Sequence, residues 1–197
     1  MTGTGRTGRR AAWSTDGVWV KRNFLPPFAL VGVLDALDGL GPRWADSERL
    51  GLLGRGGVSQ VRVDAEADRR RLDVVREALA TAVLRWARSC GFQFAAPPAL
   101  QLFPVRMKGD RQTAAYQEPH VDELPGKSRP PICTSVFYAR VRDIEGGALA
   151  VAPTLDRPGP VRVTPEANTI ATFAGDRVHW VEPLHAGERL SVVVNFY

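Results

Sequence analysis

The sequence has few cysteines and no long apolar run, and both absences narrow the class of protein. Only two of the 197 residues are cysteine, Cys90 and Cys133. They allow at most one disulfide, and no CxxC or other clustered spacing indicates a zinc site. We expect both thiols to be reduced. No apolar stretch approaches the roughly 20 residues that cross a bilayer, and none follows the first ten residues as in a secretory signal. These observations predict a cytoplasmic protein with no membrane partner.

Excess positive charge is also small once the N-terminus is set aside. The net charge is +5, but three of these charges come from Arg6, Arg9 and Arg10 in a Gly-rich stretch. The remaining net charge of +2 is too little for a surface that tracks phosphates. We therefore expect residues 1–12 to be a disordered tail, residues 13–197 to form one domain, and nucleic acid not to be a partner.

The first half of the chain predicts two helices. Prolines pre-set the start of the first helix and glycines close it. The second helix shows apolar residues at helical spacing on one face and arginines on the other. The elements expected in this half are strands at 18–20 and 58–63 and helices at 28–40 and 65–89.

From Leu100 onward, helical periodicity gives way to short β-branched and aromatic stretches separated by Gly, Pro and Asp turns. Eight strands in about a hundred residues are typical of a sandwich or jelly roll. Helices followed by strands favour helices packed on one face of the β structure. The expected strands are 102–107, 114–117, 132–142, 148–152, 161–163, 169–173, 177–181 and 189–197.

All three histidines lie in the β half, and two of them stand in a pattern typical of metal binding. In a strand, residues i and i+2 point to the same face, so His120 and Asp122 can converge on one ion. His179 lies in a later predicted strand. Two imidazoles and one carboxylate on one face of an octahedron leave three positions open. This set suits a nonhaem Fe(II) that binds cosubstrate and dioxygen together.

A cation follows His179 at a spacing that suits an anionic cosubstrate. The segment between His179 and Arg189 contains Pro183 and Gly187 and predicts a hairpin turn. Paired strands would then place Arg189 about 10 Å from His179. That gap suits a five-carbon dicarboxylate that chelates iron at one end and meets the guanidinium at the other. Ser191 lies on the same face and can add a hydroxyl.

Five short motifs occur in the order in which the Fe(II)/2-oxoglutarate dioxygenases carry them, and the chain resembles the prolyl-hydroxylase-like branch of that superfamily. The motifs are Asn23-Phe24-Leu25-Pro26, His120-Val121-Asp122, Thr134-Ser135-Val136-Phe137-Tyr138, Gly146-Gly147-Ala148-Leu149, and His179 followed by Arg189 and Ser191.

The resemblance implies an α+β, mainly β fold: a double-stranded β-helix of the jelly-roll or cupin-like kind with the N-terminal helices packed on one face. It also implies two cofactors, Fe(II) and 2-oxoglutarate. The implied residues are His120, Asp122 and His179 for iron, Arg189 with Tyr138 and Ser191 for the distal carboxylate of 2-oxoglutarate, and Thr134 and Leu149 for the walls of that pocket.

The implied activity is hydroxylation of an unactivated C–H bond of a small metabolite or amino acid by dioxygen, with 2-oxoglutarate decarboxylated to succinate and ascorbate as the reductant in vitro. Asp122 argues against halogenation, because related halogenases carry a small residue there so that halide can bind iron. Desaturation and cyclisation stay open.

Three alternatives accompany this prediction. One is hydroxylation of a prolyl or other residue within a peptide. Another is a noncatalytic jelly-roll binding module, against which the intact ligand set and Arg189 speak. Nucleic-acid dealkylation is a weaker alternative, because Val194 and Asn195 stand where that family carries a second arginine.

Substrate contacts are expected from side chains on early and late strands and from one loop, where an arginine would suit a carboxylate-bearing substrate. The loop at 123–131 follows two candidate ligands and is either a lid or a plain surface connection. The candidate substrate residues are Gln101, Arg106, Tyr116, Arg129, Trp180 and Asn195.

Overall fold

The computed structural model of the protein describes residues 12–41, 44–46, 54–61, 66–94, 98–123, 129–154 and 159–197. The predicted tail at 1–12 lies outside these residues except for Ala12, which begins the first strand. The elements are β1 (Ala12–Thr15), β2 (Val18–Arg22), α1 (Pro27–Asp38), β3 (Trp44–Asp46), β4 (Gly54–Arg55), β5 (Val58–Val61), α2 (Glu66–Ser89), β6 (Leu100–Lys108), β7 (Ala115–His120), β8 (Cys133–Gly146), β9 (Leu149–Ala152), β10 (Val161–Val163), β11 (Thr169–Ala174) and β12 (Val178–Phe196).

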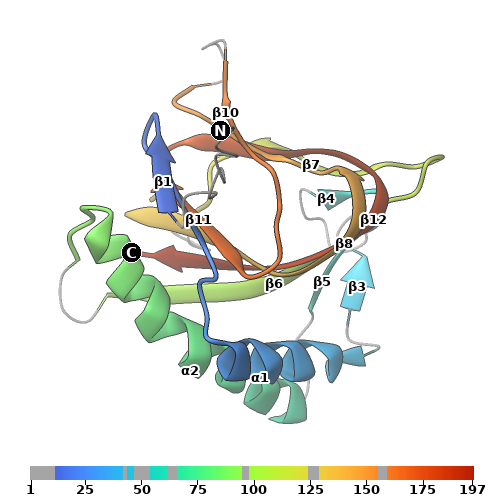
Figure 1. Ribbon diagram of the computed structural model, residues 1–197, viewed down its shortest axis with the longest axis horizontal. Coiled ribbons are helices and arrows are strands. Elements are labelled where there is room, and N and C mark those ends of the chain that lie inside the picture. Colours follow the sequence, from blue (N-terminus) through green and yellow to red (C-terminus); the bar gives the residue numbers. More distant parts are fainter. Residues whose placement is uncertain are drawn as a thin grey trace, which may run out of the picture.

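Two antiparallel layers of strands share the long strand β12, which curves from one layer into the other (Figure 1). The larger layer has the order β1-β2-β11-β8-β12-β6-β5-β3. The first half of β12 instead pairs with β9 and β7, to which β10 and β4 are added. This jelly-roll arrangement, with both helices outside the larger layer, agrees with the fold expected from the sequence (Figure 1).

The hairpin predicted between His179 and Arg189 is wrong. Both residues belong to one strand, in which the pairing with β8 shifts register between 184 and 188 and again between 190 and 191. Gly187 has φ +82 in one of these irregularities, and a Cβ there would lie 2.3 Å from the Arg142 carbonyl oxygen. Bulges bend a strand without ending it. The Pro and Gly residues that suggested a turn therefore belong to a bent strand.

The helices cover the outer face of the larger layer. Helix α1 begins after Pro26 with Pro27 in its first turn, as the sequence predicts, and the Gly39 N–H closes it on the Asp35 carbonyl. The apolar faces of α1 and α2 pack on outward-facing side chains of β8, β11 and β12. Neither helix in the described part of the chain combines the length and the apolar character needed to span a membrane.

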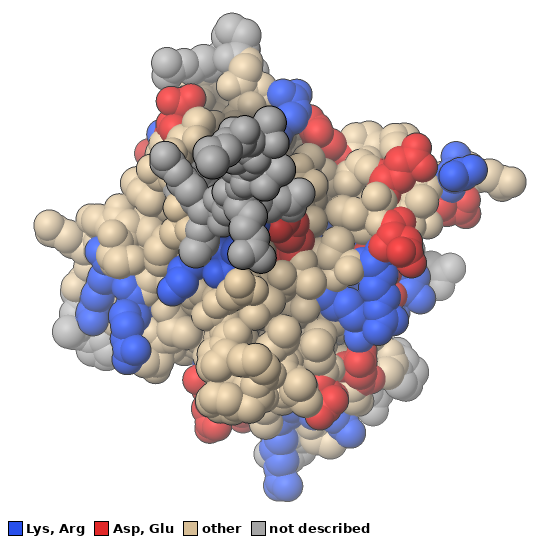
Figure 2. All heavy atoms as spheres, in the orientation of Figure 1, with Lys and Arg blue, Asp and Glu red and all other residues tan. Residues whose placement is uncertain are grey.

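Charged side chains do not gather into one basic surface on the face shown in Figure 2, where Lys and Arg alternate with Asp and Glu. The two cysteines are free thiols, and Cys133 is buried in the core between the helices and the larger layer. Burial raises the pKa of the Cys133 thiol to about 12, so this thiol stays protonated and unreactive at neutral pH.

The inner faces of the two layers enclose a second body of apolar side chains. Val136 and Tyr138 from β8 face Leu149 and Val151 from β9 across this interior. Several polar side chains are buried among them, including His179 at 5% exposure and Arg189 at 2%. A closed apolar interior is an unfavourable place for a cation. These polar residues therefore mark the functional part of the interior.

Candidate metal centre and anion pocket

Three predicted ligands converge at one end of the interior cavity. His120 ends β7, Asp122 follows it, and His179 lies directly opposite His120 in the register of β12. The His120 and His179 Nε2 atoms lie 3.7 and 3.6 Å from the two carboxylate oxygens of Asp122. The candidate ligand atoms of all three residues lie within 4.8 Å of one another. The strand pairing therefore brings the two imidazoles together, whereas Asp122 lies beyond the end of β7 and reaches them from the segment that follows the strand, not through the alternation of a strand as expected.

Backbone carbonyls hold both imidazoles in a ligating orientation. His120 Nδ1 lies 2.7 Å from the Glu118 oxygen, and His179 Nδ1 lies 3.2 Å from the Arg177 oxygen. Because a carbonyl oxygen only accepts, each Nδ1 carries a proton, and Nε2 is the ring nitrogen left to present a lone pair to the shared centre when a metal binds. Metal-binding histidines commonly make this second hydrogen bond.

Burial also keeps the innermost histidine neutral. It lowers the pKa of His179 to about 4, against the opposing attraction of Asp122. The Phe173 ring, 4.9 Å from the imidazole between ring centroids, forms part of this apolar environment. A neutral imidazole is the form that binds a metal. One carboxylate with two imidazoles fits a divalent transition metal such as Fe(II).

Asp122 has a hydrogen-bond partner of its own, which the sequence motifs do not predict. The Thr134 hydroxyl, on β8, donates to Asp122 Oδ2 at 3.2 Å. The resemblance assigns Thr134 to the wall of the 2-oxoglutarate pocket, whereas in the structure its hydroxyl holds the metal-facing carboxylate. The contact depends on the position of the chain after β7, which no local pattern specifies.

At the other side of the cavity, Arg189 is buried without an acidic partner among the described residues. Its Nη1 donates to the Gly147 carbonyl at 3.0 Å, and its guanidinium lies over the Tyr138 ring, 4.9 Å from the centroid. Burial lowers the pKa of Arg189, but a guanidinium remains charged in proteins. A buried cation without a counter-ion is costly, so this site fits an anionic ligand.

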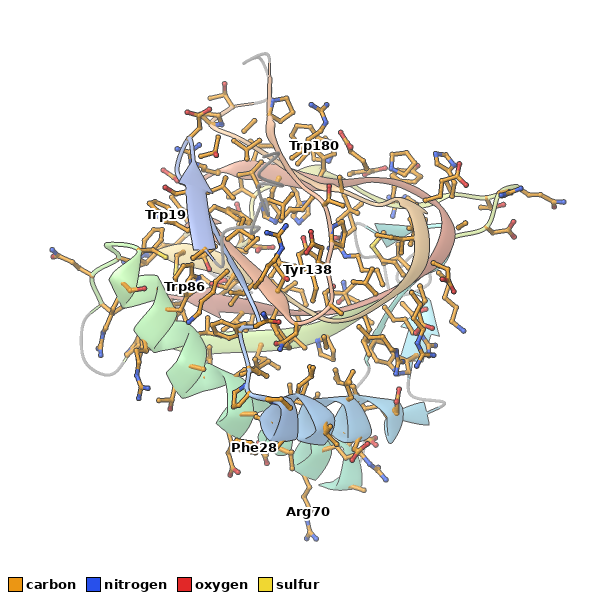
Figure 3. All side chains as sticks on the ribbon, in the orientation of Figure 1. Trp19, Phe28, Arg70, Trp86, Tyr138 and Trp180 are labelled. Atoms are coloured by element: carbon orange, nitrogen blue, oxygen red, sulfur yellow. The ribbon has the colours of Figure 1, made fainter. Side chains whose placement is uncertain are left out.

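Two further polar atoms at this end lack partners. Neither Arg189 Nε nor the Tyr138 hydroxyl has a hydrogen-bond partner in the described part of the chain, although both are buried. Tyr138 lies inside the ring of strands (Figure 3). Buried polar atoms are nearly always paired in native proteins. A carboxylate accepts from both a guanidinium and a phenol. The unpaired donors therefore fit the distal carboxylate of 2-oxoglutarate.

The Gly-Gly turn predicted before Leu149 shapes this pocket. Gly146 and Gly147 have φ +86 and +73, and a Cβ on Gly146 would lie 2.1 Å from the Pro183 carbonyl oxygen. Glycine is needed at both positions because left-handed backbone excludes most side chains. The turn places the Gly147 carbonyl where it accepts a hydrogen bond from Arg189. It also places Leu149 in the cavity wall.

No known family model and no curated protein matches the sequence, but many solved structures match its fold. A prolyl hydroxylase from Trichoplax adhaerens, solved with a hypoxia inducible factor oxygen degradation domain peptide, superposes with a TM-score of 0.64 at 14% identity over 93% of this chain and 84% of its own. A Pseudomonas putida prolyl-4-hydroxylase gives 0.58 at 17% identity over 92% of each chain. A viral collagen prolyl hydroxylase from Paramecium bursaria Chlorella virus-1, solved with 2-oxoglutarate, gives 0.58 at 13% identity over 92% and 96%.

The fold is that of the 2-oxoglutarate/Fe(II) oxygenases. The resemblance stated from the sequence motifs is thus confirmed at the level of the fold. A fold by itself does not determine an activity, which depends on the side chains of the site. The positions of the individual site residues therefore matter more than the superposition.

Six of the eight residues that the resemblance assigns to iron and 2-oxoglutarate line one cavity, and the other two, Thr134 and Tyr138, contact members of that set. The sequence analysis missed one polar lining residue, Gln117, and several apolar ones. The pleat of β7 could have indicated Gln117, because buried Ala115 two positions earlier faces inward. The cavity is lined by Phe103, Val105, Gln117, His120, Asp122, Val136, Leu149, His179, Val181, Arg189, Ser191 and Val193.

Three candidate substrate residues do not face this cavity. Tyr116 alternates with Ala115 and Gln117 and is 37% exposed. Arg106 points to the opposite face of β6, where its guanidinium lies 4.9 Å from the centroid of the Trp44 ring. Trp180 alternates with His179 and Val181, which face the cavity.

Of the remaining candidates, two lie on the inner face of the strands and one lies on the surface. Gln101 and Asn195 are Cα partners on β6 and β12, with the same strand parity as the cavity-lining residues Phe103 and Val193. Arg129 is exposed. Within the predicted lid loop at 123–131, residues 124–128 lie outside the described residues.

Proposed function

We propose that the protein is an Fe(II)- and 2-oxoglutarate-dependent dioxygenase that hydroxylates a C–H bond of a small metabolite or amino acid. One observation carries the proposal: a single cavity holds a His-Asp-His ligand set and a buried arginine without an acidic partner among the described residues. A purely structural arginine at this depth would need a carboxylate beside it. A ligand set and an anion site in one cavity fit a metal-chelating keto acid.

His120, Asp122 and His179 would hold the iron, and Arg189 with Tyr138 would hold the distal carboxylate of the keto acid. When bound, Fe(II) and 2-oxoglutarate would supply the oxidising chemistry with dioxygen as the oxidant: the keto acid would lose carbon dioxide and take one oxygen atom to become succinate, and the other oxygen atom would enter the C–H bond of the substrate. The protein contributes binding and orientation. The Glu118 and Arg177 carbonyls fix the imidazoles.

The apolar walls of the cavity have a separate role. Phe103, Val136, Leu149, Val181 and Val193 line it, so little water can share the interior with the reacting groups. Exclusion of water protects a strong oxidant from side reactions and strengthens the electrostatic contacts of the site. Asp122 in place of a small residue supports hydroxylation over halogenation.

Hydroxylation of a residue within a peptide is a second candidate. It is favoured by the Trichoplax prolyl hydroxylase, which was solved with a peptide. A noncatalytic binding module is disfavoured, because such a module needs neither oriented imidazoles nor an unpaired buried arginine. The two enzymatic candidates share the same metal ligands and the same keto acid site.

The test is 2-oxoglutarate turnover with added Fe(II) and ascorbate, followed as succinate release. We expect His179→Ala to lower the rate at least a hundredfold, because loss of a ligand should exceed the 10- to 100-fold effect of losing an outer-shell partner. His185→Ala, which removes an exposed histidine of the same strand, is the matched control and should leave the rate unchanged. Equal rates for wild type and His179→Ala would refute the enzyme assignment.

A further inference from the structure

A row of polar side chains lies on the inner face of three neighbouring strands, beyond the residues that line the cavity. Asn195 on β12 is the Cα partner of Gln101 on β6 and of Thr134 on β8. Directly paired residues of antiparallel strands point to the same face. Val193, two positions before Asn195, lines the cavity, so all three side chains of the row stand on its inner face.

One contact connects this row to the metal end, and a second joins Gln101 of the row to Tyr197. Thr134 donates to Asp122, as described above. The Tyr197 hydroxyl donates to Gln101 Oε1 at 3.0 Å. Burial raises the pKa of Tyr197, the nearby Asp122 carboxylate raises it further, and the Asn195 side chain lowers it. Thr134, the Cα partner of Asn195, therefore joins the row to the metal-facing carboxylate.

Asn195 is the unexplained member of the row. Its side chain is 1% exposed, and neither Nδ2 nor Oδ1 has a hydrogen-bond partner within 3.5 Å among the described residues, although the carboxamide stands close enough to the Tyr197 hydroxyl to lower the pKa of that phenol. Gln101, in contrast, already accepts from Tyr197. A buried donor and acceptor left unpaired destabilise a protein unless something else satisfies them. The carboxamide thus has the same character as Arg189 and Tyr138: a polar group prepared for a ligand.

The chemistry of a carboxamide limits what this ligand can be. Its donor and acceptor lie side by side, so its complement is a group that presents an acceptor beside a donor. A carboxylate offers no donor and an ammonium offers no acceptor, so each would leave one polar atom of the carboxamide unpaired. Arg106, which the sequence analysis offered for a substrate carboxylate, faces Trp44 on the other side of β6.

We propose that Asn195, flanked by Gln101 and Tyr197, forms a subsite that recognises an amide group of the substrate next to the metal centre. This inference rests on the proposed function, because it places the bound amide beside the reacting groups. The amide can belong to a primary carboxamide, to a cyclic amide, or to the backbone of a linear peptide. All three present an acceptor for the Asn195 donor and a donor for the Asn195 acceptor. A site built around unpaired polar groups rejects ligands that leave those groups unpaired.

The test compares amides with matched compounds that lack the amide. The protein is loaded with Mn(II), which accepts the same carboxylate and imidazole ligands, and with 2-oxoglutarate under nitrogen, and binding is measured by calorimetry. The pairs are glutamine and glutamate, cyclo(Gly-Pro) and proline, and N-acetylproline methylamide and proline. We expect the amide member of at least one pair to bind about tenfold tighter or more, as one to two hydrogen bonds supply. The pair that responds identifies the source of the amide.

Substitutions at position 195 test whether Asn195 is the source of the preference for amides. Asn195→Leu should remove it, so that both members of the responding pair bind within about twofold of each other, while Mn(II) and 2-oxoglutarate bind as before. Gln93→Leu, which removes an exposed carboxamide, is the matched control and should retain the full preference. Asn195→Asp, which keeps the size but loses the donor, gives the same answer if the leucine variant does not fold.

Two results would overturn the subsite, and both differ from failure of the proposed function. Equal binding of amide and matched compound in every pair, or a preference that survives at Asn195→Leu and Asn195→Asp, would exclude recognition by this carboxamide. Failure of the proposed function would instead appear in the first titration, as wild-type protein that binds neither Mn(II) nor 2-oxoglutarate.

Discussion

At the metal end of the cavity each imidazole already has a hydrogen-bond partner, whereas at the arginine end two buried donors have none. The metal end is prepared by contacts within two residues of each histidine: Glu118 holds His120, and Arg177 holds His179. At the arginine end the Gly147 carbonyl and the Tyr138 ring hold the guanidinium, but its Nε and the Tyr138 hydroxyl are left without partners among the described residues. The difference indicates that the protein orients its metal ligands in advance and uses the cosubstrate itself to complete the second half of the site.

Of the substitutions at the two ends of the cavity, replacement of Arg189 should have the largest effect on ligand binding. We expect Arg189→Met to weaken 2-oxoglutarate binding at least a hundredfold, because loss of a buried charge partner costs about 3–5 kcal/mol. Metal binding should change little. The free energy of unfolding without cosubstrate should rise by about 1 kcal/mol, since an apolar side chain replaces an uncompensated cation. Calorimetric titration and urea unfolding provide the two measurements.

Arg140→Met is the control for that experiment. Arg140 donates to Asp38 at 2.9 Å and to Glu188 at 3.3 Å, so its replacement should lower the free energy of unfolding and leave 2-oxoglutarate binding intact. If Arg189→Met destabilised the protein as Arg140→Met does, Arg189 would be a packing residue.

Tyr138→Phe should have a smaller effect at the same end. The Tyr138 hydroxyl is buried and unpaired, so its removal should leave the folded protein as stable as wild type or slightly more so. Binding of 2-oxoglutarate should weaken about tenfold or somewhat more, as expected for one hydrogen bond to a carboxylate. An unchanged dissociation constant for 2-oxoglutarate would mean that the phenol does not contact the cosubstrate.

Thr134→Val tests the metal end and should have the smallest effect of the three. It keeps the shape of the side chain and removes the hydroxyl that donates to Asp122. We expect Mn(II) affinity to fall about tenfold, at the lower limit of outer-shell effects, with 2-oxoglutarate affinity measured at saturating metal unchanged. Thr172→Val is the matched control, because Thr172 is buried in the same layer but bonds to Ser135 and Trp86. Equal metal affinities for both variants would contradict the role of Thr134.

The sequence predicted the helices and most strands because their patterns are strong and local. Both helices lie within about two residues of their expected bounds, where proline, glycine and apolar periodicity act together. Strands β1, β3 and β4 were not predicted, because two to four residues at a sheet edge carry no periodic signal. The division of β12 into two strands was wrong because a bulge uses the same residue types as a turn.

The residues of the candidate site also divide into those that could be predicted from the sequence and those that could not. His120, Asp122, His179 and Arg189 could be predicted, since their spacing is itself the signal. The contact of Thr134 with Asp122 could not, because it depends on where the chain runs after β7 leaves the sheet. Gln101 and Asn195 were predicted as candidates, but Arg106 was placed with them although the pleat of β6 sends it the opposite way.

Strand β12 carries a histidine ligand at one end and the buried arginine further along, so the spacing between the two halves of the active centre is a length of backbone. Inserting or deleting a single residue would reverse the alternation of every side chain beyond it and turn the guanidinium toward the helices. Only the irregular stretch at 184–188 could absorb such a change. Evolution along this strand should therefore proceed by exchange of side chains, with changes in length confined to those five positions.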